Sequence, residues 1–253
     1  MPRVNKKGAS IHYRGEGDGP TLVLAHGYTN RSETWYERGY VAALKPKYRL
    51  VLIDARGHGQ SDKPHDPQFY TSDKFASDIV AVLDDLGLKT AAYWGYSRGG
   101  WIGFALARHA LDRIACFVIG GASGRVAAAE PGKESPVITA LRRGVAEYVK
   151  LYDEEVSPPH RARLLVNDAA ALIACGPQRP IEGFSDVVRS IAVPTFLYAG
   201  SDDPVHDAVR QTASEIAGAR FVSLPGLGHV AANERSDLLL PHVEPFLAKA
   251  LGR

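Results

Sequence analysis

The sequence predicts an α/β protein with a mostly parallel sheet, helices on both faces of the sheet and an inserted helical cap. Short apolar runs rich in β-branched residues alternate with longer segments of helical periodicity, which is the pattern of successive strand–helix units. Three of these runs lead directly into glycine-containing turns that carry a serine, an aspartate or a histidine. In a parallel sheet such turns gather at the carboxyl edge of the strands, where open α/β proteins bind their ligands.

The strands follow from the apolar runs. A run near residues 11–13 predicts an antiparallel edge strand. The other runs predict parallel strands at residues 21–25, 48–53, 91–95, 114–119, 195–199 and 220–224. Between these strands, an apolar stripe over residues 72–86 predicts an amphipathic helix, and a second helix is expected immediately after Ser97.

Residues 124–185 interrupt this alternation. The segment is much longer than the few residues that usually join a strand to the next helix. It contains helical pieces at 137–152 and 161–175, separated by a pair of prolines at 158 and 159. We therefore expect a helical cap over 124–185, inserted into a core formed by residues 1–123 and 186–253.

The composition is that of a globular protein with one sizeable core. Hydrophobic residues make up 45% and charged residues 23% of the 253 positions, which argues against a disordered chain. The 30 Lys and Arg residues are scattered along the chain, and the net charge is only +2. This charge pattern favours neither nucleic-acid binding nor membrane binding.

Compartment and cofactor use follow from a few further features. Cys116 and Cys175 match no metal-ligand spacing and no secreted disulfide framework, so we expect free thiols. Residues 1–10 lack the apolar segment of a signal peptide, and no stretch approaches the roughly 20 apolar residues that cross a bilayer. We expect a cytoplasmic protein that acts on a small molecule and needs no cofactor or metal.

The sharpest functional signal is the segment GYSRGG at residues 95–100, between a predicted strand and a predicted helix. This is the context of the G-x-S-x-G nucleophile elbow, in which a tight and strained turn exposes the serine Oγ above the sheet. Small residues two positions before and after the serine let the turn close. The pentapeptide alone would also fit a glycine-rich turn with an incidental serine, so Ser97 needs partners to count as a nucleophile.

A serine hydroxyl is a weak nucleophile unless a base lies within hydrogen-bond distance and a third group holds the base. Two later turns supply such groups. GSDDP at residues 200–204 follows one predicted strand, and GLGH at 226–229 follows the next. The three turns lie at the same edge of the sheet, in the chain order serine, aspartate, histidine. We predict Ser97 as nucleophile and His229 as base, with Asp202 or Asp203 behind it.

Acyl transfer also requires donors for the developing oxyanion, and these are usually backbone amides. HGY at residues 26–28 follows the strand at 21–25, and its glycine would let the chain turn back over the nucleophile. The amides of Tyr28 and of Arg98, the residue after the nucleophile, are the candidates for the oxyanion hole. We expect His26 to brace this loop by hydrogen bonds, because His229 already fills the role of the base.

Asp54 is a rival for the triad acid. It opens the segment DARGHGQSDKP at residues 54–64, which follows the strand at 48–53. However, Asp54 precedes Ser97 in the chain and lies on a loop expected elsewhere along the sheet edge. We assign this loop a structural role.

Together these segments resemble the α/β-hydrolase superfamily, in particular the branch of carboxylesterases, cofactor-free haloperoxidases, carbon–carbon bond hydrolases and epoxide hydrolases. The matching motifs are HGYT at 26–29, DARGHGQSDKP at 54–64, GYSRGG at 95–100, GSDD at 200–203 and GLGH at 226–229. The resemblance implies that the acid lies three residues after the glycine that closes the strand, which is Asp203.

Two departures from the pattern bear on the reaction. Epoxide hydrolases and haloalkane dehalogenases carry an aspartate at the elbow, so Ser97 speaks against both activities. Arg98 stands where members of the superfamily more often have Leu or Met. Its side chain has two possible places, pointing at the substrate or packing under the cap.

The expected function is hydrolysis of a small ester or ester-like substrate through an acyl-serine intermediate. Hydrolysis of a carbon–carbon bond in a β-diketone would use the same residues, although enzymes of that kind usually show a longer glycine-rich stretch at residues 28–30. A ligand-binding or signalling protein on this scaffold could also keep the triad, because fold does not fix function. The sequence leaves the substrate and the oligomeric state open.

Overall fold

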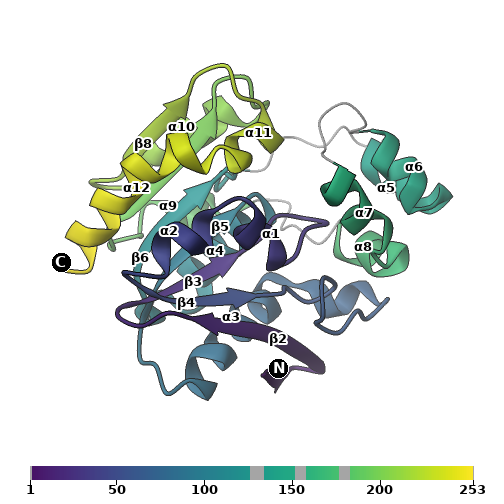
Figure 1. Ribbon diagram of the computed structural model, residues 1–253, viewed down its shortest axis with the longest axis horizontal. Coiled ribbons are helices and arrows are strands. Elements are labelled where there is room, and N and C mark those ends of the chain that lie inside the picture. The colour runs from purple at the N-terminus through teal and green to yellow at the C-terminus, as the bar shows by residue number, and fades with distance from the viewer. Residues whose placement is uncertain (1, 126–133, 152–157, 177–182, 253) are drawn as a thin grey trace.

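The computed structural model describes residues 2–125, 134–151, 158–176 and 183–252. In this part of the chain, eight strands form one sheet in the order β1-β2-β4-β3-β5-β6-β7-β8 (Figure 1). The strands are β1 (Arg3–Lys6), β2 (Ala9–Glu16), β3 (Thr21–Ala25), β4 (Arg49–Ile53), β5 (Ala91–Tyr96), β6 (Ile114–Gly120), β7 (Thr195–Gly200) and β8 (Arg220–Leu224). Strands β3 to β8 pair in parallel, which confirms the predicted fold class.

The N-terminal side of the sheet corrects one expectation. Residues 11–13 belong to β2, which is antiparallel to β4 as predicted. However, β2 is not the edge strand, because β1 pairs with its outer side and places Val4 opposite Ile11. The side chains of β1 are mostly exposed, so this strand has no apolar run that could have revealed it.

Helices cover both faces of the sheet, and the alternation of side chains along each strand explains why. Val23 and Val51 point to one face, whereas Leu22 and Leu50 point to the other. The first face is covered by α3 (Ser72–Asp85), α4 (Arg98–His109), α9 (Ser185–Val188) and α10 (His206–Glu215). The second face is covered by α1 (Glu33–Glu37), α2 (Tyr40–Leu44), α11 (His229–Glu234) and α12 (Ser236–Ala250). Two 3₁₀ helices, η1 (Pro67–Tyr70) and η2 (Leu111–Arg113), lie in the connections.

Besides α9, four helices lie among the described residues between β6 and β7. They are α5 (Pro136–Arg143), α6 (Val145–Lys150), α7 (Pro158–Leu165) and α8 (Ala169–Cys175). Figure 1 shows them grouped together beside the sheet. Ala174 and Cys175 of α8 join the apolar cluster on the first face of the sheet. Other buried apolar side chains of these helices form a separate cluster: Ile138, Ala140, Leu141, Tyr148, Val149, Leu164 and Leu172. No described helix of the chain is long and apolar enough to span a membrane.

The helices of this segment are shorter than the sequence pattern predicts. The stretch expected at 137–152 is interrupted at Gly144, whose φ of 120° is rarely adopted by residues with a side chain, and residue 152 lies outside the described residues. The stretch expected at 161–175 ends at Leu165 and restarts after Asp168. The Asp168 carboxylate caps α8 by accepting a hydrogen bond from the Ala171 amide at 3.0 Å.

Candidate active site

Ser97 stands between the last residue of β5 and the first residue of α4, and its backbone is strained. Its φ of 52° and ψ of −108° lie in a region that residues with a side chain seldom adopt, at a cost of roughly 1–3 kcal/mol. Two glycines allow the turn to close. A Cβ on Gly95 would lie 2.2 Å from the carbonyl oxygen of Gly99, and one on Gly99 would lie 2.1 Å from that of Ala25. The strained turn therefore has the backbone geometry that the sequence predicts for an elbow at Ser97.

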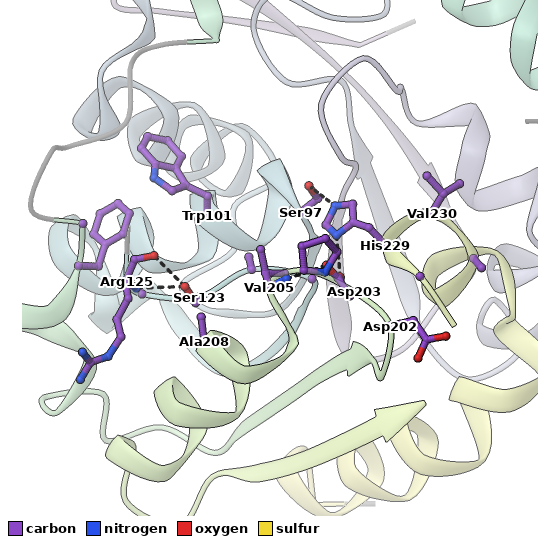
Figure 2. Close-up of a pocket in the computed structure, with 18 of the residues that line it drawn as sticks. Ser97, Trp101, Ser123, Arg125, Asp202, Asp203, Val205, Ala208, His229 and Val230 are labelled. Atoms are coloured by element: carbon purple, nitrogen blue, oxygen red, sulfur yellow. Dashed lines mark hydrogen bonds and ion pairs between the residues drawn. The ribbon is translucent and has the colours of Figure 1, made fainter. Parts of the chain in front are cut away.

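The structure brings the three predicted side chains into one hydrogen-bonded chain (Figure 2). Oγ of Ser97 lies 2.9 Å from Nε2 of His229, and Nδ1 of His229 lies 2.7 Å from Oδ2 of Asp203. A carboxylate can only accept, so Nδ1 of His229 carries the hydrogen and Nε2 presents its lone pair to the serine hydroxyl. The Asp203 side chain is 1% exposed whereas that of His229 is 36% exposed, so the carboxylate is shielded while the imidazole can reach a ligand.

Asp202 and Asp203 point in different directions, as Figure 2 shows. Oδ1 of Asp203 accepts a hydrogen bond from the Val205 amide at 3.0 Å, which fixes the carboxylate toward His229. Asp202 is exposed, and its Oδ1 accepts from the Ser201 hydroxyl at 2.8 Å. Of the two adjacent carboxylates, only Asp203 contacts the histidine.

Tyr96, at the end of β5, holds the backbone at the histidine. Its hydroxyl donates to the carbonyl oxygen of His229. Burial raises the pKa of Tyr96 well above its ordinary value, so the hydroxyl remains a donor. The sequence analysis did not identify this contact, because the variable position of the elbow motif carries no pattern of its own.

The loop after β3 passes over the nucleophile. A Cβ on Gly27 would lie 3.5 Å from the Cβ of Ser97. His26 is buried and braces this loop, since its Nε2 accepts from the Ala55 amide at 3.1 Å and its Nδ1 donates to the carbonyl oxygen of Gly27 at 2.8 Å. Burial lowers the pKa of His26, in keeping with a neutral ring that both donates and accepts. His26 therefore has the structural place expected of it.

Asp54 has a different set of partners from Asp203. Its carboxylate is buried and accepts hydrogen bonds from the amides of Ser32 at 2.7 Å and Gln60 at 2.9 Å. Nδ1 of His12 lies 2.9 Å from the same carboxylate. These contacts join the loops after β3 and β4 to β2, and they engage Asp54 away from His229.

A pocket of about 970 Å³ opens at Ser97 and His229. This is within the usual range for small-molecule sites, roughly 300–1,000 Å³. Its apolar walls come from α4, from the segment between β6 and β7, from the turn after β7 and from α10 and α11, and include Trp101, Ala122, Phe184, Val205, Ala208 and Val230. The sequence analysis missed these walls. Helical spacing could have identified Trp101, which lies one turn after Ser97 on α4.

The Arg98 side chain packs against α8 and is not among the described residues that line the pocket. It is 2% exposed, and its Nη2 donates to the carbonyl oxygens of Cys175 at 3.1 Å and Gly176 at 3.4 Å. Of the two places expected for this side chain, the structure shows the one beneath the helices that follow β6.

A family model described as the alpha/beta hydrolase fold matches residues 20–178 of the chain. The chain belongs to the α/β-hydrolase family. The matched region contains the loop after β3, the elbow at Ser97 and the helices α5 to α8. The match to the family model confirms the resemblance that the sequence motifs indicated.

Several known proteins align with this α/β hydrolase over nearly its whole length. A non-heme haloperoxidase of Rhodococcus erythropolis is 27% identical over 98% of this chain and 99% of its own. The crystal structure of the enol-lactonase from Burkholderia xenovorans LB400 is 26% identical, covers 98% of this chain and 100% of its own, and has a TM-score of 0.84. The esterase RhEst1 from Rhodococcus sp. ECU1013 is also 26% identical, covers 97% of both chains and has a TM-score of 0.82. With such relatives, the chain is an enzyme of the α/β-hydrolase class.

Proposed function

We propose that this α/β hydrolase cleaves a small ester or a cyclic ester through an acyl-serine intermediate on Ser97. The observation that carries the proposal is the hydrogen-bonded chain from Ser97 through His229 to Asp203, at the opening of a pocket on the carboxyl edge of the sheet. A serine, a histidine and a buried carboxylate in this order form the arrangement that activates a serine hydroxyl. The esterase and enol-lactonase relatives favour an ester or lactone bond as the target.

In the first half of the reaction, Nε2 of His229 accepts the Ser97 proton while Oγ attacks the carbonyl carbon of the ester. The tetrahedral intermediate carries a negative oxygen, for which the amides of Tyr28 and Arg98 are the proposed donors. Arg98 is the first residue of α4, where backbone amides lack intrahelical partners and the helix dipole favours an anion. The leaving alkoxide then takes the proton from His229, and the acyl group remains on Ser97.

In the second half, His229 removes a proton from water, and the resulting hydroxide attacks the acyl carbon. The second tetrahedral intermediate releases the acid and returns the proton to Ser97 Oγ through His229. Asp203 holds the Nδ1 hydrogen throughout, so it fixes the ring orientation and stabilises the imidazolium that forms in each half.

The segment 124–185 is proposed to act as a cap that shapes the pocket. Four of its described residues contribute to the lining: Gly124, Arg125, Gly183 and Phe184. Phe184 is buried against Trp101 at a ring separation of 5.4 Å, so the two rings form one apolar wall. Such a wall suits an apolar acyl or alkyl group next to the reacting carbonyl.

The test is a substrate panel of p-nitrophenyl esters of increasing acyl length, aliphatic lactones and β-diketones, measured with the native enzyme and with Ser97→Ala. The proposal expects turnover of esters or lactones that Ser97→Ala abolishes. Efficient cleavage of β-diketones with weak ester turnover would replace it by carbon–carbon bond hydrolysis. Tight ligand binding without turnover of any substrate would indicate a binding protein instead.

A further inference from the structure

The two residues whose amides form the proposed oxyanion hole come from different elements, yet both of their side chains bind one end of α8. The hydroxyl of Tyr28, in the loop after β3, donates to the carbonyl oxygen of Leu172 at 2.7 Å. The guanidinium of Arg98, at the start of α4, donates to the carbonyl oxygens of Cys175 and Gly176. The last turn of α8 is therefore a common anchor for both sides of the hole.

The end of a helix suits this role. The Leu172 carbonyl accepts the last hydrogen bond of α8, from the Gly176 amide at 2.8 Å, as well as the Tyr28 hydroxyl. The carbonyl groups of Cys175 and Gly176 lie at the C-terminal end of the helix, where the negative end of the helix dipole favours a cation. Among the described residues, Arg98 takes part in no ion pair, and its Nε and Nη1 have no hydrogen-bond partner. Its charge lies instead 5.3 Å from the ring centre of Tyr28 and 5.4 Å from that of Trp101. The position of this buried guanidinium thus depends on α8 and on the Tyr28 ring.

The neighbouring helices hold the same loop through Thr29. Nδ2 of Asn167, between α7 and α8, donates to the carbonyl oxygen of Thr29 at 2.8 Å. The hydroxyls of Thr29 and Tyr148, on α6, lie 3.0 Å apart. Thr29 has a φ of 65°, a conformation that costs energy for a residue other than glycine and persists only where surrounding contacts enforce it. These contacts hold Thr29, the residue directly after Tyr28, in place.

We propose that α8 positions the oxyanion hole, with the side chains of Tyr28 and Arg98 as positioning residues that fix the directions of their own amides. This inference rests on the proposed function, because it assumes that those amides bind the oxyanion. Removal of one donor from an oxyanion hole lowers kcat by about 10²–10³, and donors that are only displaced should cost less than this. The anchoring contacts should therefore affect the transition state and leave binding of the ground-state substrate nearly unchanged.

The test uses two substitutions that keep both amides. Tyr28→Phe removes a single oxygen and retains the ring. Arg98→Met keeps a long, unbranched side chain but removes the guanidinium N–H donors. Each variant is expected to lower kcat for a p-nitrophenyl ester about tenfold with KM within about twofold. Affinity for a trifluoromethyl ketone, whose adduct with serine carries the oxyanion, should fall by the same factor as kcat.

Two controls make the same substitutions elsewhere. Tyr36→Phe removes a hydroxyl that donates to the Glu16 carboxylate at 3.0 Å. Arg113→Met removes donors to the carbonyl oxygens of Lys89 and Leu88 at 2.8 and 2.9 Å, together with an ion pair to Asp84 at 2.7 Å. Both controls should retain the native kcat and the native affinity for the trifluoromethyl ketone.

The outcomes separate this inference from the proposed function. Native kcat and native ketone affinity in folded Tyr28→Phe would overturn the inference, even if Ser97→Ala is inactive and the serine mechanism stands. An active Ser97→Ala would instead overturn the proposed function itself. If Arg98→Met does not fold, Tyr28→Phe still decides the matter, because it deletes only one atom at a partly buried hydroxyl.

Discussion

The carboxylate of Asp203 lies 2.7 Å from Nδ1 of His229, whereas the carboxylate of the preceding residue, Asp202, is exposed and accepts a hydrogen bond from Ser201. The two adjacent aspartates thus differ in burial and in hydrogen-bond partners, and only Asp203 contacts the histidine, which makes them an informative pair for mutagenesis.

Asp203→Asn is expected to lose most activity while it remains folded. In serine proteases, the loss of the carboxylate that orients the histidine lowers kcat by about 10⁴, because the ring takes the wrong tautomer. Asp202→Asn should retain the native kcat with at most a modest fall in melting temperature. Steady-state kinetics and thermal unfolding of both variants check this, and an inactive Asp202→Asn beside an active Asp203→Asn would assign the acid to Asp202.

The walls of the pocket predict a shift in chain-length preference. Val205 lines the pocket, so Val205→Phe should fill part of the space beside Ser97 and favour shorter acyl groups. In an apolar pocket one methylene is worth about 1–3 kcal/mol, which corresponds to a change of roughly 10- to 200-fold in kcat/KM between neighbouring chain lengths. Val166→Phe is the control, because Val166 is 70% exposed. An unchanged chain-length profile in Val205→Phe would show that the acyl group lies elsewhere.

Acid should destabilise the protein through His58. Its side chain is buried, and burial, followed by the neighbouring charges, lowers its pKa to about 3 from an ordinary value of 6.5. Below about pH 6.5 the unfolded chain therefore binds a proton that the folded chain does not. The stability contribution is fully present above pH 6.5 and is lost as the pH falls toward 3, by up to about 1.4 kcal/mol per pH unit for one such group.

Urea unfolding at several pH values between 7.5 and 4.5 measures this effect. His58→Asn, which retains a donor for the carbonyl oxygen of Arg56, should have a shallower dependence of the unfolding free energy on pH by about one proton. Equal slopes in the native protein and in His58→Asn would contradict a neutral, buried His58.

Much of the fold could be predicted because strands buried on both faces of a sheet appear in the sequence as short apolar runs. The strands β3 and β8 agree with the predicted ranges, and β5, β6 and β7 extend by only one residue. Strands β3, β5, β6 and β7 are almost entirely buried and therefore appear in the sequence as nearly continuous apolar runs. Strand β1 lies at the exposed edge and left no such trace. The break at Gly144 was missed as well, because a helical pattern of apolar residues continues across it.

The part of the candidate site that could be predicted consists of residues in the short turns that directly follow a predicted strand. Ser97, Asp203 and His229 meet this condition, and the hydrogen bonds join all three. The place of Arg98 could not be predicted in this way, because it depends on how α8 packs against the loop after β3. Cys175 and Gly176 lie 77 and 78 positions after Arg98, and no local sequence pattern indicates contacts over such a separation.

The measurement that tests the central claim most directly is covalent labelling of Ser97 by a fluorophosphonate, located by mass spectrometry of the digested protein. The surface provides an internal control: Nε2 of His206 lies 2.9 Å from Oγ of Ser223, and Nδ1 of His206 lies 3.1 Å from Asp207. Ser223 has similar partners but lies on β8 without a strained elbow. The account predicts one label per chain, on Ser97, with loss of hydrolysis in proportion to labelling and no effect of Ser223→Ala. Full hydrolysis by a protein that is completely labelled at Ser97, or by Ser97→Ala, would contradict it.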